Sequence, residues 1–145
     1  MPDRRPPRRP AALWALLSLL LLQGLGGLAG GISLVLGPKG EIMKMPVSYL
    51  DGSPFPDYLV PGLILLLVLG VFPLVALIGL WMRRSWAWYA AFAVGCGLMI
   101  WIIVEVTIIP FDLLQVIFGA VGVLITFVTL LAPVRRYCGV RILGD

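Results

Sequence analysis

Four long apolar runs, separated by short polar or proline-containing segments, account for most of the chain. They cover about residues 11–36, 59–82, 86–109 and 113–132. A helix needs roughly 20 consecutive apolar residues to cross the hydrocarbon core of a bilayer, and each run reaches that length. The pattern therefore predicts an all-α, polytopic membrane protein, with a four-transmembrane-helix bundle over residues 11–133.

Composition supports the same fold class. Hydrophobic residues make up 61% of the 145-residue chain, and charged residues make up only 12%. Charged residues account for about 25% of an ordinary soluble domain. We therefore expect the lipid bilayer to act as the solvent for most of the chain. The length permits one domain.

The side chains of the usual catalytic and metal sites are scarce. The chain contains no His and only two Cys, Cys96 and Cys138. Metal-ligand sets and nucleophilic triads depend largely on these residue types. We therefore expect no metal site, no cofactor and no enzyme activity. The two cysteines lie too far apart along the predicted helices to form a disulfide.

The first apolar run has a competing interpretation as a secretory signal peptide, because a basic segment precedes a leucine-rich core. The Arg8-Arg9 pair also matches the start of a twin-arginine signal. The run continues to residue 36, however, whereas the core of a signal peptide is only about 7–15 residues long. A retained membrane helix fits this length better.

Arginine residues concentrate on one side of the predicted bundle. The N-terminal segment, the 83–85 loop and the C-terminal segment hold nine Arg, whereas the first loop and the 110–112 turn hold two Lys beside four acidic residues. Because positive charge stays on the cytoplasmic side, both termini are predicted to be cytoplasmic. Residues 1–10 are predicted to form a disordered basic tail, and residues 134–145 a second basic tail. Charges gathered at helix ends do not indicate nucleic acid.

The first loop, residues 37–58, is too apolar to extend freely into water. Its aromatic side chains, which include Phe55 and Tyr58, suit the membrane interface. We predict that the loop folds back over the outer end of the bundle as a short lid. Asp57 would then lie at the N-terminus of the second helix, where a negative charge is favourable. The loop carboxylates lack the spacing of a known cation-binding loop, so we interpret them as solvated.

Small residues indicate where the helices approach one another. The first run contains two overlapping G-x-x-x-G spacings, which permit close packing between membrane helices. Gln23, at mid-depth in the same run, is expected to point inward. Pro73 lies in the middle of the second run, where it removes a backbone hydrogen bond and should kink the helix. The glycines predicted to pack are Gly26, Gly27, Gly30 and Gly31, together with Gly97 in the third run.

One charged residue, Glu105, lies within the four apolar runs. Residues three or four apart share a helix face, which places Ala90, Val94, Gly97 and Trp101 on the face of Glu105. An acidic residue inside a membrane usually faces the bundle interior or a water-filled cavity. Glu105 is therefore the principal candidate for a functional residue, with Trp101 one turn below it.

The predicted spans contain no Lys or Arg that could neutralise Glu105. Its expected partners are neutral donors, such as the hydroxyl of Tyr58, the amide of Gln115, backbone amides of the loop, or water. Two interpretations follow from this arrangement. Glu105 is either a latch that ties the lid to the third helix, or a proton or cation site beneath the lid.

The turn between the third and fourth runs contains a helix-capping signal. Pro110 disfavours helix at the residue before it and should end the third helix. Asp112, followed three residues later by Gln115, matches a capping box that opens the fourth helix. Asp112 and Gln115 therefore belong to the predicted structure of the turn as well as to the surroundings of Glu105.

Two segments of the chain carry a resemblance to known proteins. The segments are SPFPDYLVPG, residues 53–62, and WIIVE, residues 101–105, with the following turn and Gln115. Together they resemble a family of small, uncharacterised, four-helix bacterial integral membrane proteins, over roughly residues 37–133. The resemblance implies a four-helix fold in the bacterial cytoplasmic membrane but implies no activity.

Three classes of function compete at this point. The first is a non-enzymatic accessory or assembly component, which associates with a second copy or with another membrane protein through its small-residue faces. The second is a proton- or cation-coupled transporter that uses Glu105 as the ion site. The third is a membrane enzyme, which would need an acid-base partner for Glu105 from a few Asp and Tyr side chains. The lack of a reactive constellation favours the first two.

Overall fold

A computed structural model of the protein describes residues 8–141. All regular structure within this range is helical, and the range contains no strand. Four helices are long and apolar enough to cross a membrane: Ala11–Leu36, Leu59–Trp81, Ser85–Ile108 and Leu113–Leu130. The predicted all-α bundle of four membrane-spanning helices is confirmed. Most of the predicted disordered tail, including Arg4 and Arg5, lies outside the described residues.

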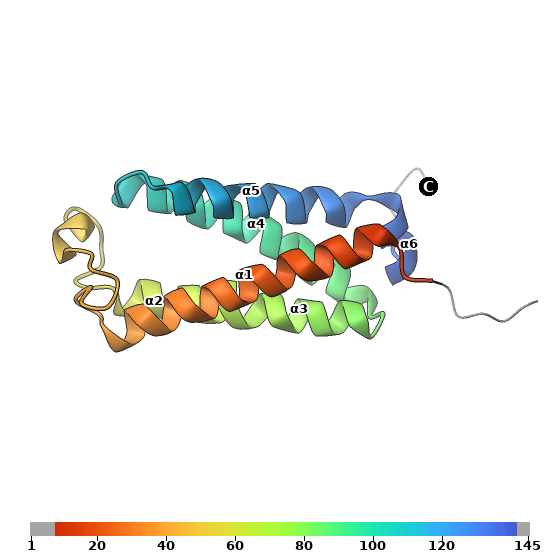
Figure 1. The fold of residues 1–145 in the computed structure, drawn as a ribbon, viewed down its shortest axis with the longest axis horizontal. Coiled ribbons are helices and arrows are strands. Elements are labelled where there is room, and N and C mark those ends of the chain that lie inside the picture. Colours follow the sequence, from red (N-terminus) through yellow and green to blue (C-terminus); the bar gives the residue numbers. More distant parts are fainter. Residues whose placement is uncertain (1–7, 142–145) are drawn as a thin grey trace, which may run out of the picture.

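The helices form two antiparallel hairpins (Figure 1). The first span pairs with the second, and the third pairs with the fourth. The hairpins lie close together at the end that carries the C-terminal helix and splay apart toward the 37–58 loop. The elements are α1 (Ala11–Leu36), η1 (Val47–Leu50), α2 (Leu59–Leu66), η2 (Leu67–Val71), α3 (Phe72–Trp81), α4 (Ser85–Ile108), α5 (Leu113–Leu130) and α6 (Ala132–Cys138). The second, third and fourth spans differ from the predicted ranges by one or two residues.

Two separate hydrophobic clusters hold the bundle together. The main core joins all four spans in the half of the bundle next to α6, and includes Leu16, Leu80 and Ile125. A smaller cluster of Leu34, Leu50 and Tyr58 lies at the loop end. The splayed hairpins are therefore joined tightly at one end, and only the loop cluster closes them at the other.

The glycines of α1 bring it against the second span. A methyl group at Gly27 would overlap the carbonyl oxygen of Leu69, and one at Gly31 would lie 2.6 Å from the Cα of Leu66. Contacts this close to backbone atoms exclude any larger residue at these two positions. The G-x-x-x-G spacing of Gly27 and Gly31 therefore lies directly at a helix-helix contact.

The two neighbouring glycines of α1 contact side chains rather than backbone. A methyl group at Gly26 would lie 3.0 Å from the ring of Phe118 in α5, and one at Gly30 would lie 3.1 Å from Leu65 in α2. The overlapping glycine spacings thus face two different helices. As a result α1 contacts both hairpins.

Gly97 does not pack as the sequence suggested. A methyl group there would have no heavy atom of the described chain within 4 Å. The buried face of α4 instead runs through Val94 and Leu98, and one residue corresponds to about 100° around a helix. Gly95 makes the close contact with α5, because a methyl group there would lie 2.9 Å from the backbone nitrogen of Thr126.

The second span is interrupted where Pro73 was expected to disturb it. Residues Leu67–Val71 form a π-helical segment between α2 and α3. Because proline has no N–H, the carbonyl of Leu69 lacks its usual donor four residues ahead. The buried side chain of Gln23 supplies a replacement, since its Nε2 donates to the Leu69 carbonyl oxygen over 3.1 Å. Gln23 therefore points inward, as predicted, and repairs the break.

The C-terminal segment differs from the predicted tail. It begins with the helix α6, and Pro133 lies in the first turn of that helix rather than at the end of the span before it. Val134 and Cys138 are buried in the main core. This part of the basic segment is consequently folded against the bundle.

Most of the outer surface of the spans is apolar. Large hydrophobic side chains are exposed on every span, among them Leu25, Val68, Ile103 and Phe127. Exposure of this extent along four apolar helices means contact with a lipid bilayer. Both ends of the described chain lie at the α6 end of the bundle, opposite the 37–58 loop (Figure 1).

Candidate functional site

A cavity of about 530 Å³ lies between the splayed hairpins, on the loop side of the main core. All four spans and the 37–58 loop contribute to its walls. This volume falls within the range of about 300–1,000 Å³ that is usual for small-molecule sites. The walls are mainly aliphatic and aromatic, and include Leu34, Leu65, Ile102 and Phe118.

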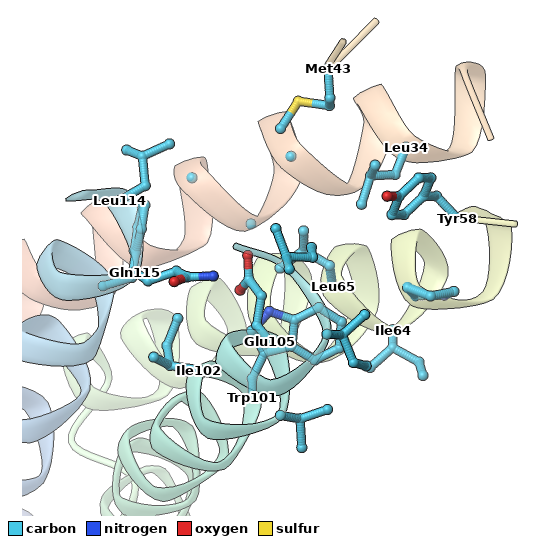
Figure 2. Close-up of a pocket in the computed structure, with 18 of the residues that line it drawn as sticks. Leu34, Met43, Tyr58, Ile64, Leu65, Trp101, Ile102, Glu105, Leu114 and Gln115 are labelled. Carbon is cyan, nitrogen blue, oxygen red and sulfur yellow. The ribbon is translucent and has the colours of Figure 1, made fainter. Parts of the chain in front are cut away.

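Glu105 lies at the centre of this cavity (Figure 2). Its side chain is half-buried, and its carboxylate points from α4 into the space beneath α1. Trp101, one turn earlier on α4, and Gln115, from the first turn of α5, both direct a side-chain N–H group toward the carboxylate. The predicted association of Glu105 with Trp101 and Gln115 is therefore present in the structure.

The helix cap determines the direction of the Gln115 amide. Leu113 N–H donates to Asp112 Oδ1 over 2.7 Å, and Asp112 N–H donates to Gln115 Oε1 over 3.2 Å. The predicted capping box is confirmed. Because Oε1 is held by the cap, the opposite face of the amide, Nε2, is directed into the cavity (Figure 2). The cap and the site thus share one side chain.

Two buried polar atoms of the cavity lining lack a hydrogen-bond partner within residues 8–141. They are Nε2 of Gln115, which stops short of hydrogen-bonding geometry to Glu105, and Oε1 of Gln23. The two side chains are only 4% and 2% exposed. Unpartnered buried polar atoms are rare in folded proteins because each carries a full desolvation cost. One donor and one acceptor therefore remain for a bound group.

The cavity carries negative charge only. Among the described residues that line it, Glu105 and Asp112 are acidic and none is Lys or Arg. A carboxylate in apolar surroundings is costly unless a proton, a cation or several donors accompany it. The lining therefore favours a positively charged occupant or a proton.

Two of the predicted partners are engaged elsewhere. Tyr58 lies beside Leu34 at the far end of the cavity, and its hydroxyl donates to the Pro46 carbonyl oxygen over 2.9 Å. Burial raises the pKa of this hydroxyl, and the adjacent Tyr49 adds to the rise, so it remains a neutral donor. Tyr58 therefore fixes the loop rather than Glu105.

Asp57 also serves a local structural purpose. Its Oδ1 accepts from the N–H of Leu59 over 3.0 Å, at the start of the second span. It does not line the cavity formed by the described residues. The predicted position of Asp57 near a helix N-terminus is confirmed, and it takes no part in the surroundings of Glu105.

Sequence reasoning missed the contribution of Gln23 and of the apolar walls. Gln23 was expected to point inward, but nothing in the sequence indicates that one of its two polar atoms remains free beside the cavity. Ile102 and Phe118 look like any other apolar residues of a span. A signal for Gln23 was present in its mid-span polarity, whereas the walls had none.

No family model, curated protein or solved structure matches the chain. Within residues 8–141, no group of three or more His, Cys, Asp or Glu side chains is placed to hold a metal ion. The polar groups of the site include the carboxylates of Glu105 and Asp112, the amides of Gln23 and Gln115 and the indole of Trp101, in a largely apolar cavity.

Proposed function

We propose that this protein is a non-enzymatic component of the bacterial cytoplasmic membrane in which Glu105 binds a proton or a cation, as part of a proton- or cation-coupled carrier. The observation that carries the proposal is the half-buried Glu105 carboxylate in a cavity of about 530 Å³, with no Lys or Arg among the described lining residues. A carboxylate in such surroundings favours a proton or a positive charge over the empty ionised state.

The charge distribution supports an orientation with both termini in the cytoplasm. Arg135 belongs to α6, and Arg9 and Arg83 both contact Tyr137 of α6. The acidic loop lies at the other end of the bundle (Figure 1). By the positive-inside rule, the α6 end is cytoplasmic. The cavity and Glu105 then lie in the extracytoplasmic half of the membrane, beneath the 37–58 loop.

Proton flux into liposomes tests this function. The purified protein is reconstituted with a trapped pH-sensitive dye, and a potassium gradient with valinomycin supplies the driving potential. We expect the parent protein to acidify the lumen faster than empty liposomes do. Glu105→Gln keeps the shape of the side chain but cannot ionise, and it should return the rate to that of empty liposomes.

Glu41→Gln is the matched control for this experiment. Glu41 is an exposed acidic residue of the same loop side, and it does not line the cavity formed by the described residues. Its substitution should leave the flux unchanged. Thermal unfolding in detergent verifies that both variants fold. Equal flux from the parent, Glu105→Gln and empty liposomes would contradict proton transport through Glu105.

One observation favours a second candidate, an accessory or assembly component. Ala93 is exposed on α4, and Gly97, one turn later, has open space beside it within the described chain. Small residues four apart on an outer face let another membrane helix approach closely. The partner would be a second copy or another membrane protein.

Cross-linking tests this candidate. In a variant without the native cysteines, a cysteine replaces Ala93, and bismaleimide is added to membranes. We expect a cross-linked species of higher mass. The same substitution at Val123, an exposed residue of α5, is the control and should give none. Identical patterns from the two positions would remove the α4 face as an association surface.

A further inference from the structure

We propose that the cavity binds an amphipathic organic cation, a molecule with an apolar body and one ammonium or comparable positive group. This inference rests on the proposed function, because it names the class of cation that the Glu105 site takes. It differs from proton or metal-ion binding in requiring the whole cavity, and not only the carboxylate.

The composition of the walls distinguishes an organic from an inorganic cation. A hard metal cation takes about six or more oxygen ligands. The cavity offers the Glu105 carboxylate at its centre and apolar side chains such as Leu65 and Ile102 around it. Aliphatic walls cannot replace the hydration shell of a metal ion, whereas they bury the apolar body of an organic ion favourably.

Glu105 and Trp101 together suit a positively charged group. The carboxylate supplies the counter-charge, and the indole ring of Trp101 lies next to it in the cavity (Figure 2). A cation over an aromatic face is stabilised by the electron density of the ring, more strongly where water is excluded. The pair therefore offers one ionic and one aromatic contact to the same group.

The unpartnered amide atoms complete the site. Nε2 of Gln115 points toward the Glu105 carboxylate but makes no hydrogen bond to it. Gln23 is only 2% exposed, and its Oε1 remains as an acceptor for an N–H or a polarised C–H group of the ligand. A closed apolar core would leave neither atom unpaired, so both indicate a site built to receive a polar group.

The splayed hairpins provide access from the membrane. Three lining residues also reach the outer surface of the bundle: Ile64 is 37% exposed, Val104 46% and Leu114 55%. They belong to α2, α4 and α5, so only single side chains separate the cavity from lipid on these helices. An amphipathic cation partitions into the bilayer and can therefore reach Glu105 laterally.

Binding of a matched pair of hydrophobic ions tests the proposal. Tetraphenylphosphonium and tetraphenylborate have nearly the same shape and opposite charge. Equilibrium dialysis measures each radiolabelled ion against the full-length protein in a neutral detergent, with protein-free micelles as the blank. We expect saturable binding of tetraphenylphosphonium and no saturable binding of tetraphenylborate.

Two variants test the Glu105 charge and the cavity volume separately. Glu105→Gln should weaken tetraphenylphosphonium binding by about 10- to 100-fold, the usual effect of losing an interaction with a charged group. Ile102→Trp fills the cavity and keeps the Glu105 carboxylate, and it should abolish binding of this ion. Glu41→Gln should bind like the parent. Size-exclusion profiles and thermal unfolding establish that each variant is folded.

The outcomes distinguish this inference from the proposed function. Equal binding of the two ions, or equal affinity in Glu105→Gln and Glu41→Gln, would overturn the organic-cation site. If that happens while Glu105-dependent proton flux persists, the ion site stands and takes a proton or an inorganic cation only. If tetraphenylphosphonium binds as expected without any proton flux, the site stands and proton transport through Glu105 fails.

Discussion

At the residue scale, Gln115 links the start of a helix to the candidate site. Its Oε1 accepts from the backbone of Asp112, and its Nε2 faces Glu105. A substitution at Gln115 would therefore change the cap and the cavity together. Asp112 affects the cap more directly, so it is the better residue for measuring what the cap contributes.

Asp112→Asn should be tolerated, because asparagine caps a helix as well as aspartate does. Asp112→Leu removes the acceptor for the Leu113 N–H and should lower the free energy of unfolding by about 0.5–2 kcal/mol. Thermal unfolding in one detergent compares the two variants with the parent. Identical melting temperatures for both variants would show that the cap contributes nothing.

Cys138 should react slowly with alkylating reagents. Its thiol is buried on the side of α6 that faces the main core, and this burial raises its pKa to about 11. Because a raised pKa lowers the fraction of thiolate at a given pH, alkylation near neutral pH is slowed, and the rate should rise about tenfold per pH unit. Maleimide labelling of the native protein measures this against a cysteine placed at the exposed Arg84. Labelling of both cysteines at one rate near pH 7 would refute the buried position.

At the element scale, glycine contacts and one side-chain hydrogen bond determine how α1 packs against the second span. Gly27 lies against the Leu69 carbonyl, which is the same carbonyl that Gln23 satisfies in place of the missing Pro73 N–H. Close approach and the hydrogen bond therefore depend on each other, because a larger residue at position 27 would move Gln23 away from its acceptor.

Gly27→Ala and Gly97→Ala form a matched pair on two membrane helices. The first places a methyl group into backbone and should destabilise the protein by about 1–3 kcal/mol, as overpacking does. The second meets no atom of the described chain within 4 Å, and should be neutral or stabilising by up to about 1 kcal/mol from helix propensity. Unfolding midpoints measure both, and a smaller loss for Gly27→Ala than for Gly97→Ala would contradict the packing.

A double-mutant cycle tests whether Gln23 repairs the break at Pro73. Pro73→Ala restores an N–H that can donate to the Leu69 carbonyl, so Gln23→Leu should cost less in that background than in the parent. The expected coupling is about 0.6 kcal/mol, and at most about 1.7, typical of hydrogen bonds between membrane helices. The cost of the unpartnered Gln23 Oε1 cancels in the cycle. Zero coupling would mean that the hydrogen bond from Gln23 to Leu69 contributes nothing to the free energy of unfolding.

At the scale of the whole molecule, the position of the charges and the splay of the hairpins point to the same asymmetry. The arginine-rich end is the tightly packed end, and the end with the loop holds the cavity. In the proposed orientation, an occupant would reach Glu105 from the extracytoplasmic half of the membrane. This arrangement depends on the orientation of the bundle, which labelling can determine.

Cysteines placed at Asp51 and Arg84 should report opposite sides of the membrane. A membrane-impermeant maleimide added to intact cells is expected to modify position 51 and to spare position 84, because positive charge stays inside. Lysis should then expose position 84 to the reagent. Cys138 is unsuitable as a reporter, since it is buried on whichever side it lies. Modification of position 84 before lysis would reverse the proposed orientation.

The sequence determined the features that depend on local chemistry. Apolar runs of sufficient length must be helical across a membrane, because lipid offers no partner for backbone N–H and C=O groups. The capping box of Asp112 and Gln115 is complete within four residues, and Gln23 had to turn inward because lipid cannot solvate an amide. Pro73 determined the position of the break in the second span, because proline lacks a backbone N–H in any structure.

The tertiary structure alone decided where the cavity lies and what surrounds Glu105. Gly97 and Gly95 differ by only two positions along α4, yet only Gly95 contacts α5, and a helical repeat cannot specify which side a neighbour occupies. Tyr58 was available to Glu105 by sequence but bonds to Pro46 instead. The splay of the hairpins depends on how side chains from distant segments pack together and how closely their backbones approach. A local sequence pattern does not show which distant segments meet.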